Sequence, residues 1–90
     1  MELIVNHTYE AKRPKTVGLI DPLIDDRMIV WIGMLEVQYD SPSVRFGQRL
    51  PKVSKEAFLR WAKRDITDEM PKGEWRAVNS MRPNTSSTAD

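Results

Sequence analysis

The sequence predicts an α+β domain: a small antiparallel sheet, or an SH3-like β-barrel, of about four to five strands with one C-terminal amphipathic helix. Short stretches of alternating apolar and polar residues recur with turn residues between them. Only one stretch, residues 54–67, repeats its apolar residues at the spacing of a helix. The chain has 90 residues, the size of one domain. We therefore expect a single globular domain over residues 1–78 and a disordered tail over residues 79–90.

The N-terminal part of the chain begins with an alternating stretch, ELIVNHTYEA at residues 2–11, which predicts the first strand. Pro14 and Gly18 interrupt the next stretch of chain, in which a short extended piece is expected over residues 17–20. Asp21 and Pro22 form a pair that favours a turn. The second main strand should therefore begin shortly after this turn.

The segment MIVWIGMLEVQYD, residues 28–40, predicts a hairpin with Gly33 and Met34 as a two-residue type II′ loop, in which the glycine has positive φ. This register pairs three apolar couples on one face: Ile32 with Leu35, Val30 with Val37, and Met28 with Tyr39. A single long strand bent at Gly33 is the alternative. In the hairpin register Ile29 and Trp31 lie on the half-polar face.

The C-terminal half of the domain should hold a short strand around residues 44–46 and then the helix. Ser54 is a good N-cap, and the apolar residues from Phe58 to Ile66 form one stripe over residues 54–67. Beyond this helix, Trp75 is the expected anchor of an extended segment.

The composition excludes several classes of site. There is no cysteine, so disulfides, zinc–cysteine sites and thiol catalysis are ruled out. No apolar run reaches the length of a membrane span and the start does not resemble a signal peptide, so we expect a cytoplasmic protein without membrane contact. His7 lacks an evident nucleophile, and the acidic turn DPLIDD lacks the spacing of a calcium loop. We expect no enzyme activity, no metal and no cofactor.

The charges are unevenly distributed along the chain. Residues 21–40 hold five acids and one base, whereas residues 41–64 hold seven bases and one acid. The basic block supports an alternative function, nucleic-acid binding by a small β-barrel, in which an aromatic side chain stacks on a base. The candidate contacts are Arg45, Phe46, Arg49, Lys52, Arg60, Lys63 and Arg64. The competing interpretation is a solvated helix face.

Aromatic residues support the leading hypothesis, a non-enzymatic interaction module. Three tryptophans are many for so small a core, and tryptophan and methionine are favoured at contact surfaces. Ile29, Trp31 and Met34 form the candidate interaction face, through which the protein would self-associate or bind another protein. A second alternative is a small-ligand pocket under the helix, near Tyr39 and Trp61.

Three stretches carry a resemblance to a class of proteins: TYEAKRP, DRMIVWIG, and VQYDSPSVRFGQRLPKVSKEAFLRWAKRDIT, which together span residues 8–67. They resemble the small uncharacterised accessory proteins that are carried on mobile elements such as phages and integron gene cassettes. The resemblance implies an accessory binding role and assigns no functional residue.

Overall fold

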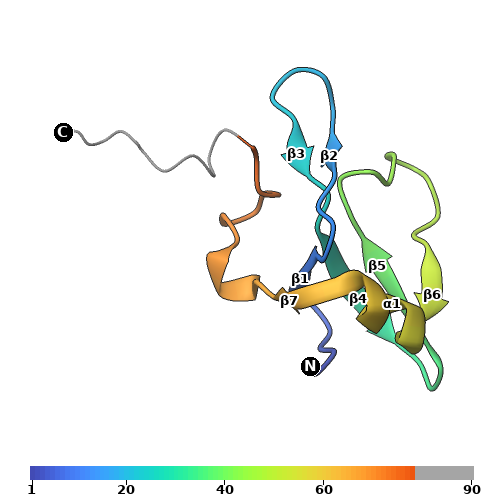
Figure 1. The fold of residues 1–90 in the computed structure, drawn as a ribbon. Coiled ribbons are helices and arrows are strands. Elements are labelled where there is room, and N and C mark those ends of the chain that lie inside the picture. Colours follow the sequence, from blue (N-terminus) through green and yellow to red (C-terminus); the bar gives the residue numbers. More distant parts are fainter. Residues whose placement is uncertain (79–90) are drawn as a thin grey trace.

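The computed structural model describes residues 1–78, so the predicted tail lies outside the described residues. Five strands form one antiparallel sheet in the order β6-β5-β4-β1-β7 (Figure 1). These strands are β1 (Thr8–Ala11), β4 (Arg27–Ile32), β5 (Glu36–Asp40), β6 (Lys52–Ser54) and β7 (Ala62–Asp65). Helix α1 (Lys55–Trp61) connects the two edge strands, β6 and β7, and lies across one face of the sheet. Strands β2 (Thr16–Val17) and β3 (Leu23–Ile24) form a separate two-stranded ribbon, and a short 3₁₀ helix (Thr67–Glu69) follows β7.

The predicted α+β class and antiparallel sheet are confirmed, but two finer predictions are wrong. The sheet does not close into a barrel, because its edge strands β6 and β7 do not pair with each other. The helix is not C-terminal, since strand β7 follows it in the chain. Among the described residues, no helix has the length and apolar character that crossing a membrane requires.

The helix is shorter than its sequence pattern predicts. The Ser54 side chain caps it by accepting a hydrogen bond from the Ala57 N–H at 3.0 Å, as expected. It ends at Trp61, because Ala62 adopts extended angles (φ −80°, ψ 135°) and begins a strand. Residues 62–65 pair with β1 instead of continuing the helix. Backbone pairing with an available strand thus outweighs the helical preference of AKRD.

The hairpin of β4 and β5 is present, but its register differs from the predicted one. Ile32 pairs with Val37 and Ile29 pairs with Tyr39. The register shifts between these pairs, because Val30 has no partner in β5 and forms a bulge. This extra residue brings Ile29 and Ile32, three positions apart, to the core side of the sheet.

Gly33 is required for a reason other than the predicted one. Gly33 does not have the positive φ that a type II′ turn would require. Its N–H donates a hydrogen bond to the Glu36 carbonyl at 2.8 Å, so Met34 and Leu35 form the tip of the hairpin. A Cβ at position 33 would lie 2.3 Å from the Trp31 ring. The glycine therefore makes room for the indole, which packs over the backbone of the turn.

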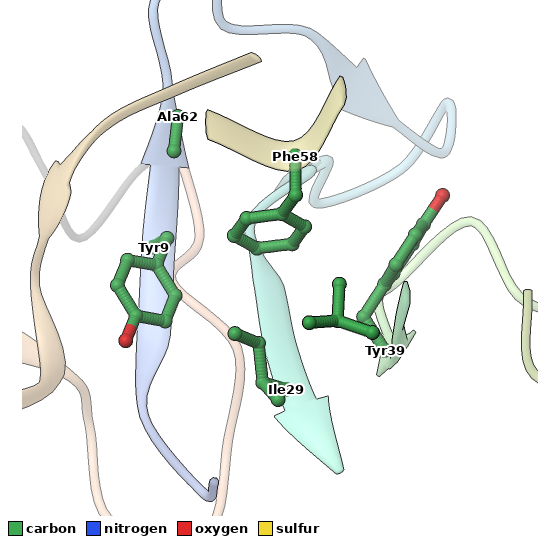
Figure 2. Close-up of a cluster of buried hydrophobic side chains, with 6 residues drawn as sticks. Tyr9, Ile29, Tyr39, Phe58 and Ala62 are labelled. Carbon is green, nitrogen blue, oxygen red and sulfur yellow. The ribbon is translucent and has the colours of Figure 1, made fainter. Parts of the chain in front are cut away.

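Helix and sheet enclose a small aromatic core. In Figure 2, Phe58 of α1 points toward Ile29 of β4, with Tyr9 and Tyr39 on either side. The rings of Tyr9 and Phe58 meet edge to face, with their centroids 5.5 Å apart. The Tyr9 hydroxyl donates to the Glu2 carbonyl at 3.0 Å and accepts from the Ile4 N–H at 2.8 Å. The N-terminal residues thus pack beside the core, and only residues 8–11 of the predicted first strand form β1.

The loops depart further from the predictions. Residues 44–46 form no strand. Of the extended piece predicted over residues 17–20, only Val17 belongs to a strand, the two-residue β2. Past the 3₁₀ helix, Leu23 forms a β-bridge with Ala77, so residues 76–78 run beside β3. Trp75 is half-buried here, whereas the adjacent Arg76 is buried.

A network of ion pairs holds this C-terminal segment. Arg76, only 4% exposed, donates from Nε and Nη2 to the two carboxylate oxygens of Asp26, at 2.7 and 2.8 Å. Arg76 also lies 3.5 Å from Glu10, which accepts from Arg64 Nε at 2.6 Å, and Arg64 in turn pairs with Glu69. We call Asp26, Arg76, Glu10, Arg64 and Glu69 the paired network.

Candidate anion-binding cleft

A hollow of about 450 Å³ lies where the end of β1, the start of β4 and the last turn of α1 meet. Two backbone hydrogen bonds position its walls: the Lys12 N–H donates to the Trp61 carbonyl and the Asp25 N–H donates to the Lys15 carbonyl, both at 2.9 Å. Its lining residues are Ala11, Lys12, Arg13, Lys15, Asp25, Arg27, Arg60 and Trp61. We call this hollow the cationic cleft.

Arg27 is the best-positioned cation of the cleft. Its guanidinium carbon lies 4.4 Å from the centroid of the Tyr39 ring and 4.2 Å from that of Trp61, within the range of cation–π contacts. Burial lowers the pKa of Arg27, while Tyr39 and Asp25 act in the opposite direction. The guanidinium remains protonated at neutral pH, because the ordinary pKa of arginine lies far above it. The two rings therefore hold a charged group at the wall of the cleft.

Most cations of the cleft have no acidic partner in the described part of the chain. Within residues 1–78, no ion pair involves Lys12, Arg13, Lys15 or Arg27. Arg60 makes one exposed pair with Glu56, at 3.4 Å across one helical turn. The cations of the lining outnumber its single acid, Asp25, and repel one another, so this arrangement does not stabilise the fold. An excess of positive charge in a hollow favours anions from solution.

Asp25 is the one acid of the cleft lining, and its side chain is incompletely bonded. Its Oδ1 atom is buried and accepts no hydrogen bond from the part of the chain that the structure describes. A buried acceptor without a donor costs about 1–3 kcal/mol. Because Asp25 also acts electrostatically on Arg27, its carboxylate partly offsets the burial of that guanidinium.

The structure disperses the basic block that the sequence singled out. Arg60 lies in the cationic cleft. Arg45 and Phe46 line a separate hollow on the loop between β5 and β6, where Phe46 is fully exposed. Arg49 and Lys52 line a further hollow, and Lys52 Nζ lies 4.9 Å from the Trp31 ring centroid. The two remaining members, Lys63 and Arg64, belong to β7, and Arg64 is part of the paired network.

The candidate interaction face also changes. Ile29 is 0% exposed and belongs to the core, because the bulge at Val30 turns it inward. Trp31 is 44% exposed, Met34 89% and the neighbouring Leu35 74%. The face that remains is therefore the apolar hairpin tip, formed by Trp31, Met34 and Leu35.

His7 gains a partner that sequence reasoning did not foresee. Its Nδ1 atom lies 2.6 Å from Asp65 Oδ2, and Thr67 donates to Asp65 Oδ1 from both its backbone N–H and its hydroxyl. Burial alone would raise the pKa of Asp65, but the hydrogen bonds from His7 and Thr67 outweigh it, so this pKa lies below its ordinary value. These contacts join β7 to the residues before β1.

Sequence reasoning missed most of the cleft. Lys12, Arg13 and Lys15 stood beside Pro14 in a stretch interpreted only as a break between strands, and Arg27 was the single base of an acidic block. The three basic residues in KRPK, residues 12–15, were the sequence feature that could have indicated a cationic site. Their proximity to Arg60 depends on the pairing of β1 with β7, which no local pattern reveals.

Comparison with known proteins adds no relative: no family, curated protein or solved structure matches this chain.

Proposed function

We propose that this protein is a non-enzymatic binding module that takes single-stranded nucleic acid in its cationic cleft. The observation that carries the proposal is a set of four cations around one hollow, none with an ion-pair partner among the described residues: Lys12, Arg13, Lys15 and Arg27. Basic side chains that track a phosphate backbone, with aromatic side chains among them, are typical of proteins that bind single strands. The half-buried Trp61 supplies an aromatic wall.

The shape of the site favours a single strand over a duplex. Proteins read duplex DNA by inserting a helix or a β-ribbon into a groove. Here the cations surround a hollow. A hollow suits a single strand of nucleic acid, because its unstacked bases can enter the hollow while its phosphates contact the cations. With about four phosphate contacts, affinity for a single strand should fall about 50-fold between about 0.05 M and 0.2 M salt.

Fluorescence anisotropy with labelled single- and double-stranded oligonucleotides tests the proposal. The double variant Lys12→Glu/Arg13→Glu should weaken single-strand binding by more than about tenfold. A matched control, Arg45→Glu/Arg49→Glu, makes the same change in charge on the loop between β5 and β6 and should weaken it far less. Equal losses in both variants would show non-specific attraction. A wild-type protein that does not bind at low salt would end the proposal.

The exposed hairpin tip favours a second candidate, self-association or binding to another protein. Trp31, Met34 and Leu35 place three large apolar side chains at one turn. Tryptophan and methionine are enriched at contact surfaces. Light scattering should then report a dimer that Trp31→Glu converts to a folded monomer, whereas Phe46→Glu, an equally apolar exposed position elsewhere, leaves the dimer intact. A monomeric wild type would exclude self-association.

A further inference from the structure

We propose that the cationic cleft binds the phosphorylated end of a nucleic-acid strand, a terminal phosphomonoester, in preference to its internal phosphodiesters. The inference rests on the proposed function and specifies which part of the strand the cleft takes. Arg27 is the group that makes the distinction.

Arg27 is held in one place before any ligand arrives. Tyr39 and Trp61 both lie within 4.4 Å of its guanidinium carbon, measured to their ring centroids. The guanidinium is planar and its N–H donors lie in that plane, so rings packed against it leave the edge to meet a ligand. Two parallel N–H donors match two oxygens of one phosphate. No described carboxylate makes an ion pair with this edge.

The charge around Arg27 exceeds what an internal phosphate supplies. A phosphodiester carries one negative charge. A phosphomonoester carries about −1.5 to −2 at neutral pH and offers three acceptor oxygens. Lys12, Arg13 and Lys15 add three further cations to the Arg27 clamp. A doubly charged end therefore gains more from the cleft than a singly charged link does.

The walls of the cleft also suit an end of a strand. They come from three parts of the chain: the segment after β1, residues 25–27, and the last turn of α1. Backbone hydrogen bonds from Lys12 to Trp61 and from Asp25 to Lys15 tie these parts together. At about 450 Å³ the hollow has the size of a small-ligand site. A terminal nucleotide fills such a space, whereas an internal one must continue out of it in both directions.

Binding of three oligonucleotides of one sequence, about eight nucleotides long, tests the inference. They carry a 5′-phosphate, a 3′-phosphate or hydroxyl groups at both ends. We expect a phosphorylated end to bind about tenfold tighter than the unphosphorylated strand. Arg27→Lys retains the charge but loses the planar fork, so it should reduce the ratio of the two affinities, phosphorylated over unphosphorylated strand, to about twofold. Arg49→Lys, outside the cleft, should leave the preference unchanged.

Urea unfolding shows whether Arg27→Lys is folded. If it is not, a second variant provides the same test. Lys12→Gln/Lys15→Gln alters only exposed side chains and should also reduce the preference. Equal affinity for all three strands would overturn the inference while leaving the proposed function intact, whereas absence of binding to any strand would overturn both. A free nucleoside 5′-monophosphate that binds as tightly as the phosphorylated strand would also overturn it, by assigning the cleft to a free nucleotide.

Discussion

Two charged regions lie side by side in the chain and behave in opposite ways. Asp26 is 1% exposed and receives two hydrogen bonds from Arg76. Its neighbours Asp25 and Arg27 line the cationic cleft, where one carboxylate oxygen lacks a donor and the guanidinium lacks an acidic partner among the described residues. The paired network and the cleft thus begin at consecutive positions.

The comparison separates charges that hold the fold from charges that are available to a ligand. In the paired network each acid meets a base, and the pairs join β1, β7, the 3₁₀ helix, the link between β3 and β4, and the C-terminal segment. In the cleft the cations repel one another and contribute nothing comparable to stability. We therefore expect substitutions in the network to change the free energy of unfolding and substitutions in the cleft to change binding.

The largest expected effect is that of Arg76→Ala. It leaves the Asp26 carboxylate buried without its partner, which should lower the free energy of unfolding by about 3–5 kcal/mol. Urea unfolding followed by circular dichroism measures this loss. The double variant Asp26→Leu/Arg76→Met should recover most of the stability, because it removes both buried charges. A loss below about 1 kcal/mol in the single variant would mean that the pair does not anchor the C-terminal segment.

The neighbouring aspartates provide a sharper comparison. Asp26→Ala removes both carboxylate oxygens that accept from the buried Arg76 at 2.7 and 2.8 Å and should cost about 3 kcal/mol or more. Asp25→Ala removes an acceptor that lacks a donor among the described residues, but it also removes a charge that favours the Arg27 guanidinium, so its net effect should stay within about 0.5 kcal/mol. Parallel urea melts of both variants give the difference. Equal losses would contradict the distinction between network and cleft.

A smaller effect is expected from pH, through Asp65. Its pKa is lower in the folded state than in the unfolded chain, so its contacts stabilise the fold above the ordinary pKa of aspartate. This contribution to the free energy of unfolding should begin to decrease as the pH falls below about 4. It should be gone once Asp65 is also protonated in the folded state. Urea midpoints between about pH 2 and 6 should therefore decline more steeply for the wild type than for Asp65→Asn. Identical slopes would place the acid sensitivity in other carboxylates.

The smallest effect should come from Arg64→Gln at the exposed end of the paired network. Arg64 and Glu69 are both about half exposed, so water and salt weaken their ion pair, and Glu10 keeps Arg76 as a second partner when Arg64 is replaced. The urea midpoint should shift slightly at low salt, and the shift should vanish at about 0.5 M salt because the pair is screened. A salt-independent loss would indicate that Arg64 contributes through packing of its side chain rather than through charge.

Several features could be predicted because their causes are local. The alternation in residues 28–40 indicated two strands with a turn between them, and Ser54 indicated the start of the helix. The register could not be predicted, since the bulge at Val30 lets Ile29 and Ile32 share the core side while Trp31 pairs with Gln38. The end of the helix could not be predicted either. Residues 62–65 were expected to be helical but form strand β7, because a short polar stretch suits a helix and an edge strand equally well.

The sequence by itself determined the α+β class, the apolar segments that build the sheet, and the cap of the helix, since each depends on residues a few positions apart. Only the tertiary structure decided where the helix ends, which face Ile29 takes, and which cations meet. Lys12 and Arg60 are far apart in the chain and become neighbours in the cleft because β7 returns to pair with β1. Long-range backbone pairing sets such distances, and it leaves no periodic trace in the amino-acid sequence.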